Sequence, residues 1–255
     1  MLLENEVQVY EEVEVSCSTG ETESYEETLF TEVIRRRELD FIKQVLRAEK
    51  PRLVLDYGCG GGWLSRLIFK WRFEVVGIDL SKRLVKIAKF VCRESDFVVC
   101  DAMRLPFKDG AFDFIIGISI LHHLPKLSMA FSELKRVSAF HALCLFMEPN
   151  LLNPVSAFGR KFFPMEAHTK GEKPFAFGYL KAALCLAGFT VEKYFALFFV
   201  AFPIARLLKV TKMELPSQMV RAILIFESVM EKIPLIRCLN SNIVALVRAQ
   251  HWFYH

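Results

Sequence analysis

The sequence lacks the features that mark membrane-spanning, secreted or repetitive proteins. Its longest stretches without Asp, Glu, Lys or Arg are twelve residues, Phe114–Pro125 and Tyr194–Ala205, whereas a spanning helix needs about 20 apolar residues. The N-terminus has neither the basic flank nor the apolar core of a signal peptide. Glycine accounts for only 12 of 255 residues and no tract repeats, which excludes collagen-like and low-complexity chains. We therefore expect a cytoplasmic protein without a transmembrane segment.

The cysteine pattern excludes two further classes. The seven cysteines are an odd number, the closest two are eight residues apart, and no CxxC motif occurs. This spacing supports neither a disulfide framework nor a zinc site, and we expect no metal. We interpret most of the cysteines as small core residues in a reducing compartment.

Charge is unevenly distributed along the chain. Residues 1–30 carry nine Glu and no Lys or Arg, which leaves 33 basic and 20 acidic residues in the other 225. We interpret this as a solvated acidic arm packed over a basic body. The alternative is a basic body that faces an anionic ligand, lipid headgroup or polynucleotide. Arg35-Arg36-Arg37 is interpreted as a solvated helix face rather than an anion clamp.

Strand and helix patterns alternate through the first part of the chain, after a weak strand or lid pattern in residues 1–24 and a helical stripe over 26–49. The expected strands are apolar throughout instead of at every second residue, as in a parallel sheet covered on both faces. The sequence therefore predicts a doubly wound α/β core over residues 50–150. The expected strands are 53–55, 74–78, 97–99, 112–118 and 140–147. Three helices are expected between them. The first has the apolar face Trp63, Leu64, Leu67 and Ile68, the second, after an N-cap at Ser81, has Leu84, Ile87, Ala88 and Val91, and the third has Leu127, Ala130, Phe131 and Leu134.

The pattern loosens after Pro149. We expect a long functional connection over 150–174, a helix around 180–187 closed by Gly188, and a strand over 189–200. A further helix would bury Met219, Ile223, Phe226 and Met230, and 243–247 would be the last strand. As organisation we predict one structural domain, with an arm and lid helix in 1–50, a cofactor half in 51–150 and an acceptor-site half in 151–255.

The segment LVLDYGCGGGWL, residues 53–64, places glycines directly after a buried strand. Glycines there let the backbone approach a ligand closely, and the following helix offers free N–H groups. A dinucleotide motif GxGxxG that starts at Gly58 needs glycine at position 63, where the chain has Trp63, so NAD or FAD is disfavoured. No Gly-Lys-Ser/Thr follows, which excludes a P-loop.

The spacing that fits is Asp56-x-Gly58-x-Gly60-x-Gly62. Here the sequence resembles the class I S-adenosylmethionine (SAM)-dependent methyltransferases over roughly residues 50–150, and the Glu-Pro-Asn after the fifth strand is typical of their type 11 group. The resemblance implies a mostly parallel seven-stranded Rossmann-like sheet, SAM as cofactor and S-adenosylhomocysteine as product. It also implies an acid at Asp79 for the ribose hydroxyls, Asp101 near the adenine amine and Asp56 near the methionyl ammonium. The expected cofactor-binding residues are Asp56, Tyr57, Gly58, Cys59, Gly60, Asp79, Leu80, Asp101, Ala102 and Ser119.

Two missing motifs and a high phenylalanine content indicate which kind of molecule receives the methyl group. The fourth strand ends in Ile118-Ser119-Ile120-Leu121, with neither the Asn-Pro-Pro-Tyr of amino-group nucleic-acid methyltransferases nor a cysteine nucleophile, so nucleic acid is disfavoured. Twelve of the 24 phenylalanines fall in residues 140–203. The phenylalanine-rich segment 194–208 has three possible interpretations. It packs in the core, it forms an aromatic wall of the acceptor site, or it forms a membrane-interface face flanked by Arg206 and Lys209.

The sequence thus predicts an enzyme that methylates a small, apolar acceptor that is lipid-like, isoprenoid or aromatic. The alternatives are a non-catalytic SAM-binding or scaffold subunit and an NAD-dependent dehydrogenase. Methyl transfer needs a base only when the acceptor holds a proton at reaction, and the candidate bases are His122, His123 and His168. Glu148 and Asn150 follow the fifth strand, where we expect loop capping ahead of substrate contact.

Overall fold

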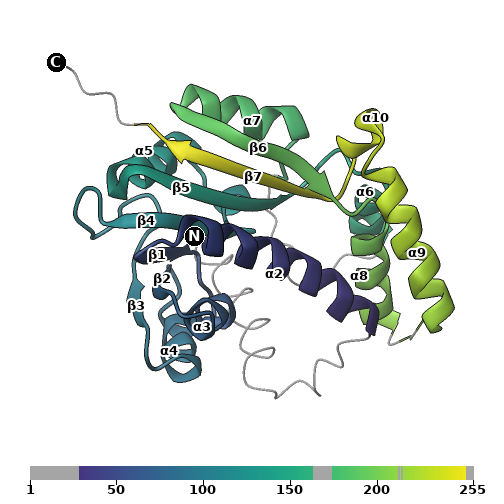
Figure 1. Ribbon diagram of the computed structural model, residues 1–255, viewed down its shortest axis with the longest axis horizontal. Coiled ribbons are helices and arrows are strands. Elements are labelled where there is room, and N and C mark those ends of the chain that lie inside the picture. The colour runs from purple at the N-terminus through teal and green to yellow at the C-terminus, as the bar shows by residue number, and fades with distance from the viewer. Residues whose placement is uncertain (1–28, 163–173, 212, 214, 251–255) are drawn as a thin grey trace.

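The computed structural model describes residues 29–162, 174–211, 213 and 215–250. The strand or lid expected in 1–24 and His168 lie outside these residues, and the side chains of Arg206 and Lys209 are not described. Seven strands form one sheet in the order β3-β2-β1-β4-β5-β7-β6 (Figure 1). Strands β1 to β5 run parallel, and β7 pairs antiparallel with both β5 and β6. The predicted mostly parallel seven-stranded α/β fold is confirmed.

The strands are β1 (Leu53–Tyr57), β2 (Glu74–Asp79), β3 (Asp96–Val99), β4 (Phe112–Ile118), β5 (Ser138–Pro149), β6 (Phe189–Leu197) and β7 (Asn242–Ala249). The helices are α2 (Leu29–Glu49), α3 (Trp63–Lys70), α4 (Lys82–Val91), the 3-10 turn η1 (Leu121–His123), α5 (Leu127–Val137), α6 (Pro154–Phe162), α7 (Phe177–Leu186), α8 (Ala201–Thr211), α9 (Ser217–Met230) and α10 (Pro234–Arg237). Among the residues that the structure describes, no helix is both long and apolar enough to cross a membrane.

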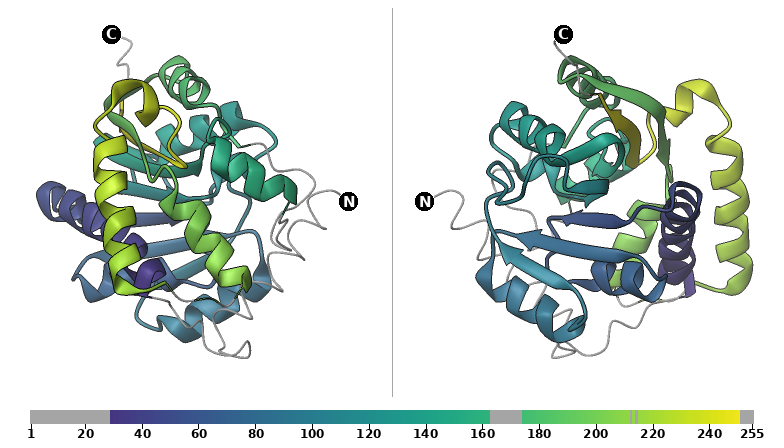
Figure 2. Two further views of the ribbon diagram at one scale, coloured as in Figure 1. Left: turned by 90° about the vertical axis from the view of Figure 1, so that its right-hand side faces the viewer. Right: turned by 60° about the vertical axis from the view of Figure 1, so that its left-hand side comes forward.

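Both faces of the sheet are buried, as the continuous apolar strands require. In β1 the side chain of Val54 packs with residues of α2, α3 and α8, whereas Leu55 packs on the opposite face with residues of α5 and α7. Figure 2 shows α2 and α9 on one side of the sheet and α5 on the other. The alternation of neighbouring residues between two cores explains why period-two hydrophobicity is absent from these strands.

Local signals for two helix ends are confirmed. The Ser81 hydroxyl accepts a hydrogen bond from the Leu84 N–H at 3.0 Å and so caps α4. Gly188 follows α7 with a positive φ of 82°, the left-handed conformation that ends helices. The buried faces of α3 and α4 differ from the predicted ones at single positions. Trp63 is 37% exposed with the Arg35 guanidinium 5.1 Å from its ring centroid, and Val85 is buried in α4 beside Leu84.

The region after β5 departs from the sequence predictions in two places. Helix α6 occupies part of the expected connection over 150–174, and β6 ends at Leu197 instead of continuing to residue 200. Phe198 has a positive φ of 61° and is fully buried, and α8 begins at Ala201. A non-glycine residue in the left-handed region breaks a strand. At 196–198 the phenylalanine-rich segment therefore lies in the core.

The predicted buried face of α9 is correct at Ile223, which packs against the core, but wrong at Met219 and Phe226. Phe226 and Met219 are 41% and 50% exposed, whereas Val220 and the carboxylate of Glu227 are buried. The Glu227 carboxylate accepts backbone hydrogen bonds from Phe199, Val200 and Ala201, where α8 begins. The first N–H groups of a helix have no partner within the helix. Because this start is buried, α9 turns Glu227 inward to satisfy it, on the side where Val220 and Ile223 meet the core. Other apolar side chains of α9, such as Met219 and Phe226, turn outward.

The arginine cluster of α2 is also more than a solvated face. Arg37 forms an ion pair with Glu231, which follows α9, and its guanidinium lies 5.4 Å from the centroid of the Phe198 ring. The Glu231 carboxylate additionally accepts the Phe198 N–H at 3.3 Å. These contacts connect α2 to the turn before α8.

Candidate functional site

The glycine loop lies between the end of β1 and the start of α3. Gly58 and Gly62 have positive φ values of 79° and 81°. A Cβ on Gly58 would lie 2.8 Å from side-chain atoms of Ile120, and one on Gly62 would lie 2.8 Å from the backbone Cα of Ala88. Both conformation and space therefore restrict these positions to glycine. The N–H groups of Gly58 and Cys59 both donate to the Ile78 carbonyl, at 3.0 and 2.7 Å, so the loop folds against the end of β2.

Asp79, at the end of β2, contacts this loop directly. One carboxylate oxygen accepts the Gly60 N–H at 3.0 Å, and the other accepts the Ser81 N–H at 2.8 Å. An ionised carboxylate offers about four acceptor sites on its two oxygens and donates nothing. Asp79 therefore keeps the capacity to accept hydrogen bonds from a vicinal diol while it holds the loop.

Asp56 is buried at the end of β1. The Ser65 hydroxyl donates to its carboxylate at 2.6 Å. Burial raises the pKa of Asp56 from 3.8 to about 7; the Ser65 hydrogen bond opposes this rise and the negative charge of Asp79 adds to it. A cation bound beside the two carboxyl groups would offset the effect of the Asp79 charge on Asp56.

The raised pKa of Asp56 predicts that stability falls as the pH rises. The folded carboxyl holds its proton up to about pH 7 and the unfolded one only to 3.8, so the free energy of unfolding decreases between these values. We expect the thermal unfolding midpoint of the unliganded protein to fall across this window, and to fall less in Asp56→Asn. Burial also raises the pKa of Glu38 to about 7, so Glu38→Gln should remove a separate part of the slope. An Asp56→Asn profile parallel to the wild-type profile would contradict this assignment.

The remaining predicted cofactor residues lie on the same edge of the sheet, with different side-chain roles. The Tyr57 hydroxyl donates to the Ala102 carbonyl at 2.8 Å, which ties β1 to the segment after β3, and burial raises the Tyr57 pKa. An oxygen of Asp101 accepts the Met103 N–H at 2.8 Å. The Cys59 side chain is buried in a small cluster with residues of α4 and β3, and its thiol donates to the Gly60 carbonyl of the loop at 3.6 Å. Leu80 is 45% exposed.

The turn after β4 is built around a buried acid. Glu148 is fully buried at the end of β5, and one carboxylate oxygen accepts the N–H groups of Ile120 and Leu121 at 3.0 and 2.7 Å. The other oxygen lies 2.6 Å from Nδ1 of His122. Ser119, at φ 54°, donates its N–H to the Met147 carbonyl. Glu148 thus fastens η1 to β5, which is the loop-capping role expected from the sequence.

Asn150 also anchors the backbone. Its side-chain amide donates to the carbonyls of Cys238 and Asn240 at 2.9 and 2.7 Å, and its oxygen accepts the Leu152 N–H. Sequence reasoning missed Asn153, which is buried and donates to the carbonyls of Phe199 and Leu239 at 2.9 and 2.7 Å. The sequence did contain a signal for this role: Asn153 directly precedes Pro154, the first residue of α6, and proline is common at the start of a helix.

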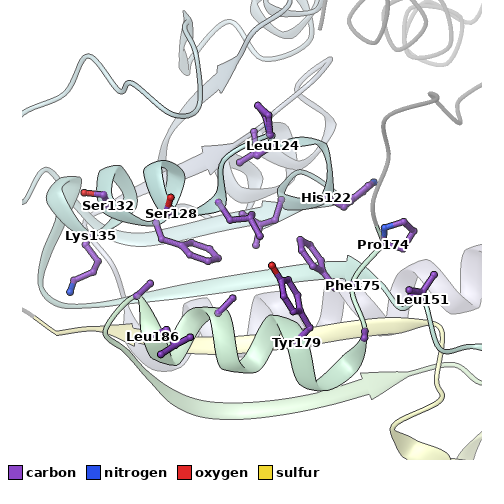
Figure 3. Close-up of a pocket in the computed structure, with 17 residues that line it drawn as sticks. His122, Leu124, Ser128, Ser132, Lys135, Leu151, Pro174, Phe175, Tyr179 and Leu186 are labelled. Carbon is purple, nitrogen blue, oxygen red and sulfur yellow. The ribbon is translucent and has the colours of Figure 1, made fainter. Parts of the chain in front are cut away.

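A groove of about 940 Å³ runs between α5 and α7 (Figure 3). His122 and Pro174 lie at one end, Lys135 and Leu186 lie toward the other, and Tyr179 lies between them. Most of the lining is apolar, with Leu121, Leu124, Leu127, Phe131, Phe175 and Ala183 among the lining residues. Ile120 lies close to Gly58 and directly precedes Leu121 and His122, two residues that line the groove.

Comparisons with known proteins agree with this geometry. The family described as "Methyltransferase domain" matches residues 55–146. Ajmaline N-methyltransferase of Rauvolfia serpentina is 34% identical over 106 residues, which are 39% of this chain and 36% of the relative. Probable tRNA methyltransferase 9B of Bos taurus is 39% identical over 83 residues, 32% of this chain and 17% of the relative. The chain thus matches about a third or less of the length of these curated relatives.

A solved structure extends the similarity of fold to most of the chain. The PH0226 protein from Pyrococcus horikoshii OT3 superposes with a TM-score of 0.58 at 18% identity, over 85% of this chain and 91% of that one. The glycine loop, the acceptor-only carboxylate of Asp79 beside it and the buried Asp56 fit an adenosyl ligand with a ribose diol and an ammonium group. Residues 55–146 therefore match a methyltransferase domain, and this similarity supports a class I S-adenosylmethionine-dependent methyltransferase with S-adenosylmethionine as its cofactor.

Proposed function

We propose that this protein transfers a methyl group from SAM to a small, apolar acceptor. The observation that carries the proposal is the junction at the carboxyl ends of β1, β2 and β4. There the Asp79 carboxylate holds the glycine loop, and Ile120, which lies close to Gly58, directly precedes Leu121 and His122 in the lining of an apolar groove. A cytoplasmic location remains a prediction.

The cofactor assignment follows the predicted residues. Asp79 would accept hydrogen bonds from the two ribose hydroxyls, and Asp56 would lie near the ammonium group. Asp101, Ala102 and Leu80 would border the adenine, and Ser119 and the backbone of residues 57–60 would border the methionyl part. The bound sulfonium supplies an electrophilic methyl group, so the protein's main task is to align the two reactants, which lowers the barrier by removing orientational freedom.

The groove supports an apolar acceptor. Its lining between α5 and α7 is mostly aliphatic and aromatic, and its volume of about 940 Å³ lies within the range of small-molecule sites. Leu121 and His122 line it and follow Ile120, which packs on the glycine loop. An acceptor in the groove would therefore present its reactive end toward the cofactor site.

Among the three candidate histidines, the geometry favours His122 as the base for an acceptor that carries a proton. Its Nδ1 is hydrogen-bonded to Glu148, so Nε2 is the ring nitrogen left to face the groove, and His122 lines that groove. A carboxylate on Nδ1 holds that nitrogen's proton in place and makes Nε2 a better acceptor. The ring of His123 packs on that of His122, with centroids 3.9 Å apart, and does not line the groove.

The proposal is tested by calorimetry with SAM, followed by assay of S-adenosylhomocysteine release with a lipid extract, a water-soluble extract and tRNA as separate acceptor sources. We expect SAM binding, with release greatest in the lipid extract. Binding without release from any source would favour a scaffold subunit, and release with tRNA alone would show a nucleic-acid acceptor. Binding of NADH without SAM would favour a dehydrogenase.

A groove variant separates the acceptor site from the cofactor site. Ser128 lines the groove from α5, so Ser128→Trp should lower product release without changing SAM affinity. Lys126 precedes α5 and is exposed outside the groove lining, so Lys126→Trp is the matched control. Equal release by both variants would contradict the assignment of the groove to the acceptor.

A further inference from the structure

Helix α9 packs some apolar side chains on the core and turns a second row of them away from the protein. Met219, Ile225, Phe226 and Val229 are between 41% and 66% exposed. At about 3.6 residues per turn these positions share one side of the helix. Scattered exposed apolar residues are ordinary, but a continuous stripe of them marks an interaction surface. Leu235 of α10, the next helix, is a further exposed apolar residue, at 85%.

The orientation of α9 is fixed by its inward contacts. Glu227 accepts the N–H groups at the start of α8, and Glu231 pairs with Arg37 of α2 and accepts the Phe198 N–H. Val220 on the same inward side is buried in the core. A rotation that buried the apolar stripe would leave the first N–H groups of α8 without an acceptor. The exposed stripe is therefore a stable feature of the fold, and Figures 1 and 2 show α9 at the margin of the molecule.

The charges beside the stripe have one sign. Arg221 lies at one margin of the stripe, Lys232 follows the end of α9, Arg237 lies in α10, and all three are exposed. The two acids of the same segment, Glu227 and Glu231, lie on the opposite side of the helix, turned toward the protein. An apolar helix face with only basic residues at its margin is the pattern of helices that lie in the headgroup region of anionic bilayers.

We propose that the outward face of α9, with α10, docks on the surface of an anionic lipid bilayer. The stripe of Met219, Ile225, Phe226 and Val229 enters the boundary between headgroups and acyl chains, and Arg221, Lys232 and Arg237 contact lipid phosphates. A second copy of the chain fits less well, because pairing two such faces would bring six cations together without an exposed acid from either helix. This inference does not depend on the proposed function.

The test is flotation of the full chain with vesicles of phosphatidylcholine alone and of phosphatidylcholine mixed with phosphatidylglycerol. We expect binding to the mixed vesicles that weakens as salt is raised, and little binding to the neutral ones. The double variant Ile225→Glu/Phe226→Glu should abolish flotation. Arg221→Gln/Lys232→Gln should weaken binding to anionic vesicles by about 30-fold, at about 1 kcal/mol per cation.

Phe90→Glu is the matched control, because Phe90 of α4 is 73% exposed and lies outside the α9 face. It should float like the wild type, and all variants should keep the wild-type thermal midpoint, since none of the changed side chains is buried. Equal flotation with neutral and anionic vesicles, or full binding by the Ile225→Glu/Phe226→Glu variant, would overturn the proposal. So would a concentration-dependent dimer that this variant disrupts, with no flotation of the wild type.

Discussion

Glu148→Ala is expected to lower the free energy of unfolding by about 3–5 kcal/mol, because it removes the acceptor of several buried donors at once. The carboxylate receives the N–H groups of Ile120 and Leu121 and the Nδ1 side of the His122 ring, and it is fully buried. Alanine leaves these groups without a partner in a site that admits little water. Chemical denaturation monitored by circular dichroism measures the change.

Two companion variants separate the network from a simple loss of charge. Glu148→Gln keeps one carbonyl acceptor for the two N–H groups but places an amide where the other oxygen was, so its cost should be smaller than that of alanine. Glu192 pairs with Arg248 at 2.8 Å on the surface, and Glu192→Ala should cost less than about 1 kcal/mol. A Glu148→Ala variant as stable as Glu192→Ala would show that the turn after β4 does not depend on this carboxylate.

The cofactor half of the fold follows from local signals in the sequence. Apolar runs such as Leu53-Val54-Leu55 are buried on both faces of a parallel strand, and this pattern needs no knowledge of distant partners. Glycines with positive φ and a serine N-cap act within a few residues of themselves. For the same reason the positions of Asp56 and Asp79 at strand ends could be predicted from strand lengths alone. The hydrogen bond between Asp79 and Gly60 was not predicted.

The half after β5 depends on contacts between residues far apart in the chain. In α9 the apolar pattern of Met219, Ile223, Phe226 and Met230 predicted the buried face, but Glu227 decides the orientation through its bonds to residues 199–201. Periodicity counts apolar residues and cannot detect that a distant helix start needs an acceptor. Similarly, Asn150 and Asn153 bond to the carbonyls of Asn240 and Leu239, which are 90 and 86 positions away in the chain. The end of β6 at Leu197 reflects the backbone turn at Phe198, a residue whose type predicts strand.

Asp79→Ala is expected to weaken SAM binding by about 1–3 kcal/mol, or roughly 5- to 150-fold in dissociation constant. The loss has two sources: the ribose hydroxyls lose their proposed acceptor, and the Gly60 N–H, bonded to Asp79 at 3.0 Å, is released from the position that shapes the loop. Asp79→Asn keeps one carbonyl oxygen and should lose less. Asp96, exposed at the opposite end of β3, provides the control, and Asp96→Ala should bind SAM like the wild type. If calorimetry gives Asp79→Ala and Asp96→Ala the same affinity, the ribose does not lie at Asp79, and the glycine loop keeps its binding geometry without this carboxylate.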